Sequence, residues 1–191
     1  MTPPPPAAPP APGAAPRTVS LLPAATEMVC LLGAEACLVG ISHECDHPPA
    51  IRDRPVLTSS RLGGEGTSAE IDRAVRARAE EALSLYSVDA EALRAAGPEV
   101  VITQDLCQVC AVSVDDVRAA VARLAHQEGV RLVTLSPTRL AHVLDDVERV
   151  AEALGRREEG VGARAELERR LDAVSERVAG AGTRLRVVSV E

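Results

Sequence analysis

Two short polar segments hold most of the side chains that could bind a metal or act as nucleophiles. The first is Ser42 to Pro49, with the sequence Ser-His-Glu-Cys-Asp-His-Pro-Pro, and the second is Gln104 to Ser113, which contains a Cys-x-x-Cys spacing. The candidate groups are His43, Glu44, Cys45, Asp46, His47, Asp105, Cys107 and Cys110. Thiolates, imidazoles and carboxylates bind zinc or iron, and a thiolate can also carry redox chemistry.

One hypothesis is therefore a metal centre. Cys107 and Cys110 are spaced as half of a zinc site, and His43, Cys45 and His47 occupy alternate positions, which share a face in an extended chain. The chain has one Cys-x-x-Cys, whereas sites built from such pairs generally use two. Zinc or iron held by His43, Cys45, Cys107 and Cys110 is the interpretation that this pattern allows.

Two other interpretations use the same residues. A thiol-redox pair needs its first cysteine at a helix start, where the helix dipole lowers the pKa of the thiol. Cys107 precedes a helical pattern, but Ser113 and Asp115 are better helix caps, and the motif lacks a Trp-Cys-Gly-Pro context. The remaining hypothesis is one wall of a cleft for a small ligand, in which a thiolate or an imidazole contacts a metal centre of the ligand.

Apolar runs that predict buried strands precede both polar segments. Strands are predicted at Arg17–Leu22, Leu38–Ile41, Pro55–Thr58, Val100 to about Thr103, and Arg131–Leu135, with a brief extended piece at Leu83–Tyr86. Helices are predicted at Ala24–Leu32, Ala69–Ala82, Ala90–Ala96 with Asp89 as its cap, and Val114–Gln127. Strands that alternate with helices predict an α/β fold with a parallel, doubly wound sheet.

In such a sheet the carboxyl ends of the strands meet at one edge, where ligands bind. The turn Pro23-Ala24-Ala25 after the first strand is therefore expected to converge with Ser42–Pro49 and with Gln104–Ser113. This convergence makes the two polar segments candidates for one shared site.

The last third of the chain is mostly helical in pattern. Apolar residues recur at helical spacing from Thr138 to about Ala179, which predicts a long linker segment of two helices with a break near Gly155 to Gly162. Arg184 to Val190 predicts a terminal strand, which either begins a second α/β unit or pairs with the edge of the first sheet. The domain boundaries expected from these patterns are a tail at 1–16, an α/β lobe at 17–137, a linker at 138–182 and a strand at 183–191.

Composition narrows the range of partners. The 191 residues are 46% hydrophobic and carry a net charge of −7, with no Phe, no Trp and one tyrosine, Tyr86. With no basic cluster and a single aromatic ring, the chain is not expected to bind nucleic acid. No apolar run approaches the roughly 20 residues of a membrane span, and the Pro- and Ala-rich start predicts a disordered tail without an export signal or lipobox. That start, as written, predicts a cytoplasmic location.

Cysteine usage gives a further expectation. The five cysteines are an odd number, which does not suit a disulfide framework. Cys30 lies in a helical apolar pattern and Cys37 directly before a strand, so both are predicted to be small buried residues.

Several segments together resemble a known family. They are Arg17-Thr-Val-Ser-Leu-Leu-Pro-Ala-Ala-Thr-Glu27, Leu38-Val-Gly-Ile-Ser42, Asp46-His-Pro-Pro49 and Gly97-Pro-Glu-Val-Val-Ile102. In order and spacing they resemble the cobalamin/iron-siderophore (Fe/B12) class of substrate-binding proteins of ABC importers, in which a long helix joins two α/β lobes. His43 to Asp46 and Asp105 to Ala111 resemble the signatures of a cobalamin-binding-protein-like subgroup.

The resemblance implies a non-enzymatic transport protein that needs no cofactor and binds cobalamin or a related metal chelate. It implies ligand contacts from the backbone of Pro23, Ala24 and Ala25, and from side chains in His43–His47 and Gln104–Cys110. Glu91 matches an acidic residue that docks on the permease, although a first-turn Glu is also ordinary at a helix start. The family is usually periplasmic or at the cell surface.

Departures from the family pattern leave alternatives open. The family generally offers aromatic rings to its ligand, and it has a second lobe after the long helix. The resemblance spans about residues 17 to 190 and so implies a chain truncated after its amino-terminal lobe. A zinc- or iron-binding or thiol-redox protein, and a truncated lobe without a ligand function, are the alternatives to cobalamin binding.

Overall fold

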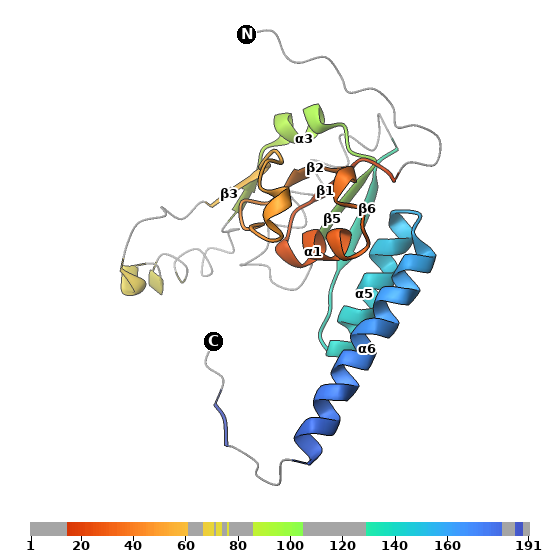
Figure 1. Ribbon diagram of the computed structural model, residues 1–191. Coiled ribbons are helices and arrows are strands. Elements are labelled where there is room, and N and C mark those ends of the chain that lie inside the picture. The colour runs from red at the N-terminus through yellow and green to blue at the C-terminus, as the bar shows by residue number, and fades with distance from the viewer. Residues whose placement is uncertain are drawn as a thin grey trace.

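A four-stranded parallel sheet forms the centre of the computed structural model, which describes residues 15–60, 67–70, 72–73, 76, 86–104, 129–180 and 186–188. The strands are β1 (Thr18–Ser20), β2 (Leu38–Ile41), β5 (Val100–Gln104) and β6 (Arg131–Leu135), in the order β2-β1-β5-β6. Every pairing between them is parallel. The predicted α/β fold with a parallel sheet is therefore confirmed (Figure 1).

Helices cover both faces of this sheet. Along β5, Val100 and Ile102 belong to the core under α1 (Pro23–Leu31) and α5 (Leu140–Ala153). Val101 lies between them in sequence and belongs to a second core with Leu93 of α3 (Ala90–Ala96). This alternation follows from the period of two in a strand, and it makes the sheet doubly wound.

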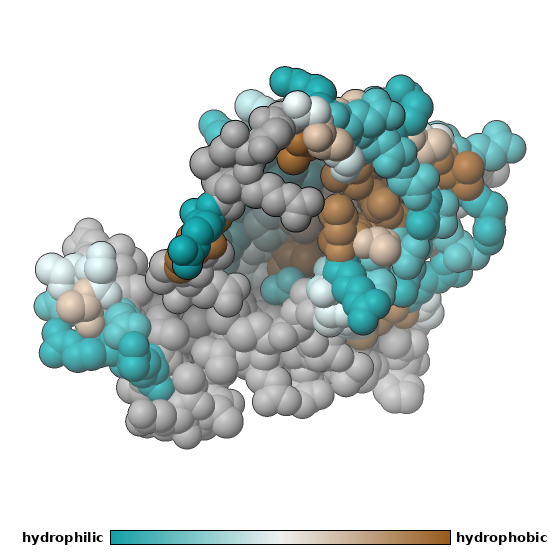
Figure 2. Space-filling view, turned by 90° about the horizontal axis from the view of Figure 1, so that it is seen from below, coloured by the Kyte–Doolittle hydropathy of each residue, from teal (hydrophilic) through white to brown (hydrophobic). Residues whose placement is uncertain are grey.

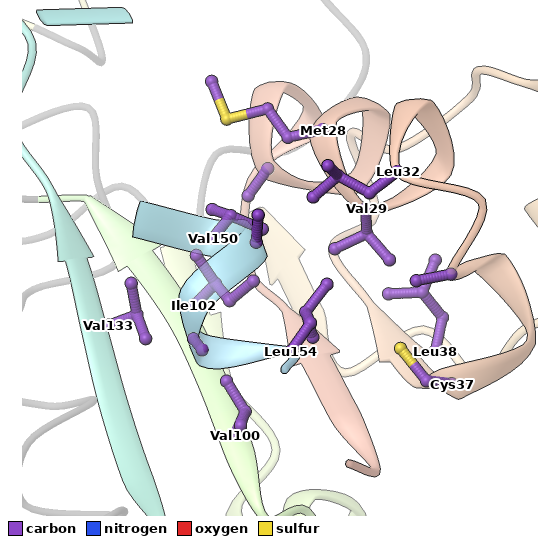
Figure 3. Close-up of a cluster of buried hydrophobic side chains, with 14 of the residues drawn as sticks. Met28, Val29, Leu32, Cys37, Leu38, Val100, Ile102, Val133, Val150 and Leu154 are labelled. Carbon is purple, nitrogen blue, oxygen red and sulfur yellow. The ribbon is translucent and has the colours of Figure 1, made fainter. Parts of the chain in front are cut away.

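The larger core is built almost entirely from aliphatic side chains and is shown in Figure 3. Its fully or almost fully buried members include Val29, Leu38, Ile102, Val150 and Leu154. Because these chains are small, the backbone elements approach one another closely. At Gly40 in β2, a Cβ atom would lie 2.3 Å from Cδ1 of Leu57, so this strand position requires glycine.

The helix before β5 has the caps that the sequence predicts. The Asp89 side chain accepts hydrogen bonds from the backbone N–H groups of Glu91 and Ala92, at 3.0 and 2.9 Å. Gly97 follows the helix with φ 52°, a left-handed conformation that glycine adopts without strain. The predicted bounds, Ala90–Ala96, are confirmed.

A second, two-stranded sheet differs from the prediction. It pairs β3 (Thr58–Ser60) with β4 (Tyr86–Val88) in an antiparallel arrangement. The strand predicted at Pro55–Thr58 is therefore placed too early: Val56 forms a single bridge to Ile41, and the antiparallel ladder begins only at Thr58. The ladder starts there because Val88 is the partner of Thr58, and that long-range pairing is not visible in local sequence.

The long helical segment folds into a hairpin. α5 ends at Ala153, Gly155 takes φ 71°, and α6 (Arg157–Ala179) returns along α5 and extends past the lobe (Figure 1). The predicted break is confirmed, slightly earlier than expected. The described residues also include the 3-10 turns η1 (Glu35–Cys37) and η2 (Pro49–Ile51), and residues 68–70, 72–73 and 76 are helical.

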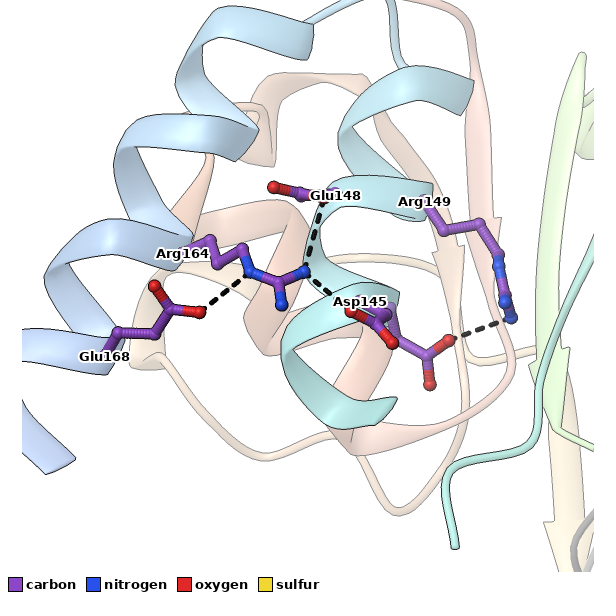
Figure 4. Close-up of polar contacts among 6 residues, drawn as sticks. Asp145, Glu148, Arg149, Arg164 and Glu168 are labelled. Carbon is purple, nitrogen blue, oxygen red and sulfur yellow. Dashed lines mark hydrogen bonds and ion pairs between the residues drawn. The ribbon is translucent and has the colours of Figure 1, made fainter. Parts of the chain in front are cut away.

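Polar contacts secure the hairpin along its outer side. The Arg164 guanidinium of α6 donates to Asp145 at 2.6 Å, to Glu148 at 3.4 Å and to Glu168 at 2.9 Å (Figure 4). These hydrogen bonds raise the pKa of Arg164, so it stays charged at all accessible pH values. The arrangement links two turns of α5 to α6.

The structure describes only part of the predicted terminal strand. Residues 186–188 belong to no strand, and Val187 and Val188 are 82% and 85% exposed. A strand needs a neighbour for its backbone hydrogen bonds, and these three residues have none among the described elements. The other residues of 184–190 lie outside the described residues, so a strand over the whole segment stays a prediction.

Asp146 on the inner side of α5 gives a prediction on pH dependence. Burial raises its pKa, Arg149 lowers it, Asp145 raises it and His142 lowers it, with burial dominant. The folded state thus binds the Asp146 proton more tightly than the unfolded state, and this contribution to stability is lost as the pH rises through the raised pKa. Asp146→Asn is expected to raise the midpoint of thermal unfolding at pH 7.

Thermal unfolding from pH 3 to 8 checks this. The gain from Asp146→Asn should vanish below about pH 4, where wild-type Asp146 is protonated in both states. Asp172→Asn is the control, because Asp172 is an exposed aspartate of α6 and is not among the groups that shift the pKa of Asp146. An Asp146→Asn protein that is less stable than wild type at pH 7 contradicts the prediction.

Candidate ligand-binding site

The loop that follows β2 is anchored at its start by Thr58. The Thr58 hydroxyl accepts from the backbone N–H of His43 at 3.0 Å, lies 2.6 Å from Nδ1 of the same imidazole, and donates to the Ser42 hydroxyl at 3.2 Å. Nε2 of His43 lies 3.5 Å from a carboxylate oxygen of Glu44. β3 therefore fixes where this loop leaves the sheet.

Cys45 faces the protein interior. It is 7% exposed, belongs to the larger core and lies 3.1 Å from the Thr26 hydroxyl of α1. Burial raises the pKa of the Cys45 thiol, while the hydrogen bond to Thr26 lowers it to a smaller extent. The thiol is thus protonated near neutral pH, whereas a metal ligand must be a thiolate.

An apolar groove opens beside this loop. It has a volume of about 720 Å³ and lies between α1, the loop at His47-Pro48, α5 and α6. Its lining residues are Pro23, Ala24, Glu27, Met28, Cys30, Leu31, His47, Pro48, Val143, Val147, Leu167 and Arg170. Figure 2, which views the molecule from the α6 end, shows apolar surface gathered beside a hollow.

Three of the predicted contact residues, Pro23, Ala24 and His47, line this groove. Ala25 is completely buried beside them, and Gln104 is half-buried at the end of β5. Asp46 is exposed, and its carbonyl accepts a hydrogen bond from Arg52 at 2.9 Å.

Part of the predicted site cannot be placed relative to the groove. Asp105, Cys107 and Cys110 fall outside the described residues. Within the described ranges, no three His, Cys, Asp or Glu side chains are grouped so that they could hold a metal ion. The zinc or iron hypothesis, which needs Cys107 and Cys110, stays a prediction. Glu91 is exposed in the first turn of α3.

Sequence reasoning missed two kinds of residue. The first kind is the hydroxyl-bearing residues Ser20, Thr26 and Thr58, which tie the loop after β2 to the sheet and to α1. Their position near strand ends was the signal in the sequence that could have identified them. The second kind is Leu167 and Arg170 of α6, which line the groove with α1 although more than 130 residues separate them in sequence. No local pattern indicates that contact.

Comparisons with known proteins were made with both sequence and structure. No protein-family model matches the chain, and no curated protein matches it. A periplasmic heme-binding protein from Pseudomonas aeruginosa superimposes with a TM-score of 0.62 and 21% identity, covering 87% of this chain and 48% of that one. The periplasmic vitamin B12-binding protein BtuF of Vibrio cholerae gives a TM-score of 0.59 and 18% identity, covering 87% and 52%.

The chain has a periplasmic-binding-protein fold. The heme-binding protein RhuT from Roseiflexus sp. RS-1 agrees, with a TM-score of 0.62, 20% identity and coverage of 88% of this chain and 52% of that one. The binding-protein fold expected from the resemblance to the Fe/B12 class is confirmed. The chain spans about half the length of these solved structures.

Location and membrane association can be compared in the same way. The matched binding proteins are described as periplasmic, so they give no support to the predicted cytoplasmic location. Among the residues that the structure describes, no helix combines the length and the apolar character needed to cross a bilayer.

Proposed function

We propose that this chain is a non-enzymatic ligand-binding lobe for a metal-bearing macrocycle, cobalamin or a related metal chelate, in ABC-type uptake. The observation that carries the proposal is the groove of about 720 Å³ to which Pro23, Ala24 and His47 contribute. The fold supports it, because structures with this fold include proteins described as binding heme and vitamin B12. Glu91, exposed in α3, is the proposed contact to a permease.

The chemistry of the groove suits such a ligand. Small-molecule sites are mostly apolar cavities of about 300–1,000 Å³ with a few polar groups that fix orientation. Met28, Val147 and Leu167 provide apolar walls, and an imidazole such as that of His47 is a ligand for cobalt or iron. The Arg170 guanidinium can donate to an amide or carboxylate oxygen on the rim of the macrocycle.

Titration with cobalamin and, separately, with hemin tests the proposal through the visible spectrum of each ligand. His47→Ala is expected to weaken binding by at least about tenfold, the lower end of what loss of a supporting group costs a metal site, and to remove the spectral change that signals imidazole coordination. His142→Ala is the matched control, because His142 contacts Thr138 at the start of α5 and does not line the groove.

Each result has a defined meaning. Binding of either probe with loss in His47→Ala alone supports the proposal and identifies the better ligand. A wild-type protein whose presence alters neither spectrum, and which retains neither ligand in equilibrium dialysis, contradicts the proposal and favours a lobe without this function.

A further inference from the structure

The Thr26 hydroxyl is the meeting point of three segments. Its oxygen lies 2.8 Å from the Ser20 hydroxyl at the end of β1, 3.3 Å from the carbonyl of Leu22 and 3.1 Å from the Cys45 sulfur in the loop after β2. Thr26, Ser20 and Cys45 are all buried, with Thr26 completely so. Water cannot replace these contacts without opening the structure.

Hydrogen bonds connect these groups to one another and to the backbone. The Ser20 hydroxyl donates to the carbonyl of Leu22 at 3.0 Å, so its oxygen is available as an acceptor for Thr26. The Thr26 hydroxyl can donate its one proton to Ser20 or to the carbonyl of Leu22, and in its contact with the Cys45 sulfur either atom can be the donor. The result is a connected group that runs from Cys45 through Thr26 and Ser20 to the backbone.

This connected group fixes the middle of the loop. Thr58 holds its beginning at Ser42 and His43, and Arg52 holds the carbonyl of Asp46. The Cys45–Thr26 contact ties the loop directly to α1, the helix that supplies Pro23 and Ala24 to the groove. His47 follows Cys45 by two residues, so its position beside α1 depends on that link.

We infer that Thr26 is the positioning residue that holds the loop Ser42–His47 against α1 and thereby sets the place of His47 at the groove. The consequence for ligand affinity rests on the proposed function, but the positioning itself does not. Thr26→Val keeps the shape of the side chain and removes the oxygen, whereas Thr26→Ser keeps the oxygen. The two variants therefore separate the hydrogen bonds from the packing.

The test measures the alkylation rate of each cysteine in the full chain by peptide mass spectrometry. Thr26→Val is expected to accelerate labelling of Cys45 by about tenfold, the scale of losing a buried hydrogen bond, and to shift the ring-proton resonances of His47. Thr26→Ser should restore both to wild-type values. Thr18→Val is the matched control, because Thr18 is equally buried in β1 but its hydroxyl donates to Pro16 at the opposite end of the strand.

Several outcomes would overturn the inference. Unchanged Cys45 labelling in folded Thr26→Val does so, as does equal acceleration in Thr18→Val, since any lost buried hydroxyl would then suffice. If Thr26→Val does not fold, Cys45→Ala removes the other end of the same contact; an unmoved His47 resonance in that variant overturns the inference too. If the wild-type chain binds neither cobalamin nor hemin, the proposed function is contradicted. The alkylation rate of Cys45 and the ring resonances of His47 still test the role of Thr26 in that case.

Discussion

Replacing Gly160 with leucine is expected to lower the free energy of unfolding by about 3 kcal/mol, the upper part of the range for overpacking a tight contact. A Cβ atom at Gly160 would lie 2.4 Å from Cβ of Ala151 and 3.5 Å from Cα of Glu148. The backbone of α5 cannot yield as a flexible side chain would. α6 must therefore move away from α5, taking Leu167 and Arg170 away from the groove.

Thermal unfolding checks this result, with a fall in the midpoint of roughly 6–12 °C for a chain of this size. Gly162→Leu is the matched control, because nothing lies within 4 Å of a Cβ atom at Gly162 in the same helix. That change should be neutral or stabilising by about 0.7 kcal/mol, since leucine is a much better helix former than glycine. Similar losses in the two variants would contradict close packing at Gly160.

Gly40→Val is expected to lower the free energy of unfolding by about 3 kcal/mol. It is also expected to disturb the loop at His43 through the core residue beneath it. A Cβ atom at Gly40 would lie 2.3 Å from Cδ1 and 2.8 Å from Cγ of Leu57, and 3.3 Å from Val19. Leu57 is 1% exposed and directly precedes Thr58, whose hydroxyl contacts His43. Displacing Leu57 should therefore shift the His43 ring resonances as well as lower stability.

A double variant separates this clash from a general intolerance of valine in β2. Leu57→Ala alone should cost about 2–5 kcal/mol because it empties a core position. Combined with Gly40→Val, it removes the side chain that the new methyl groups strike. In urea unfolding, the double variant should therefore lose less stability than the sum of the losses in the two single variants. If the two losses of stability simply add, the strain caused by Gly40→Val does not come from the contact with Leu57.

Local patterns predicted most elements of the fold because those elements depend on neighbours in sequence. The apolar run Leu38–Ile41 and the capped helix Ala90–Ala96 have the predicted bounds. The strand predicted at residues 55–58 was placed too early, because its true bounds depend on a partner strand that is distant in the sequence. β3 is placed by β4, and residues 186–188 have no partner strand among the described residues.

The candidate site was predictable only in part, for the same reason. Strand ends indicated that Pro23, Ala24 and the loop from Ser42 to His47 would lie near one edge. Side-chain direction was not indicated: Cys45, expected to face a ligand, is buried in the core and lies 3.1 Å from the Thr26 hydroxyl, whereas His47 lines the groove. The role of Asp105, Cys107 and Cys110 stays a prediction.

The sequence by itself determined the alternation of strands and helices and the edge at which polar loops collect, because hydrophobic periodicity and turn residues act within a few positions. Tertiary structure alone decided what the loop after β2 faces. The hairpin of α5 and α6 brings Leu167 and Arg170 beside α1, and the hydroxyl of Thr26 holds Cys45 inward. Both depend on contacts between distant segments, whose geometry is set by close packing of the whole core.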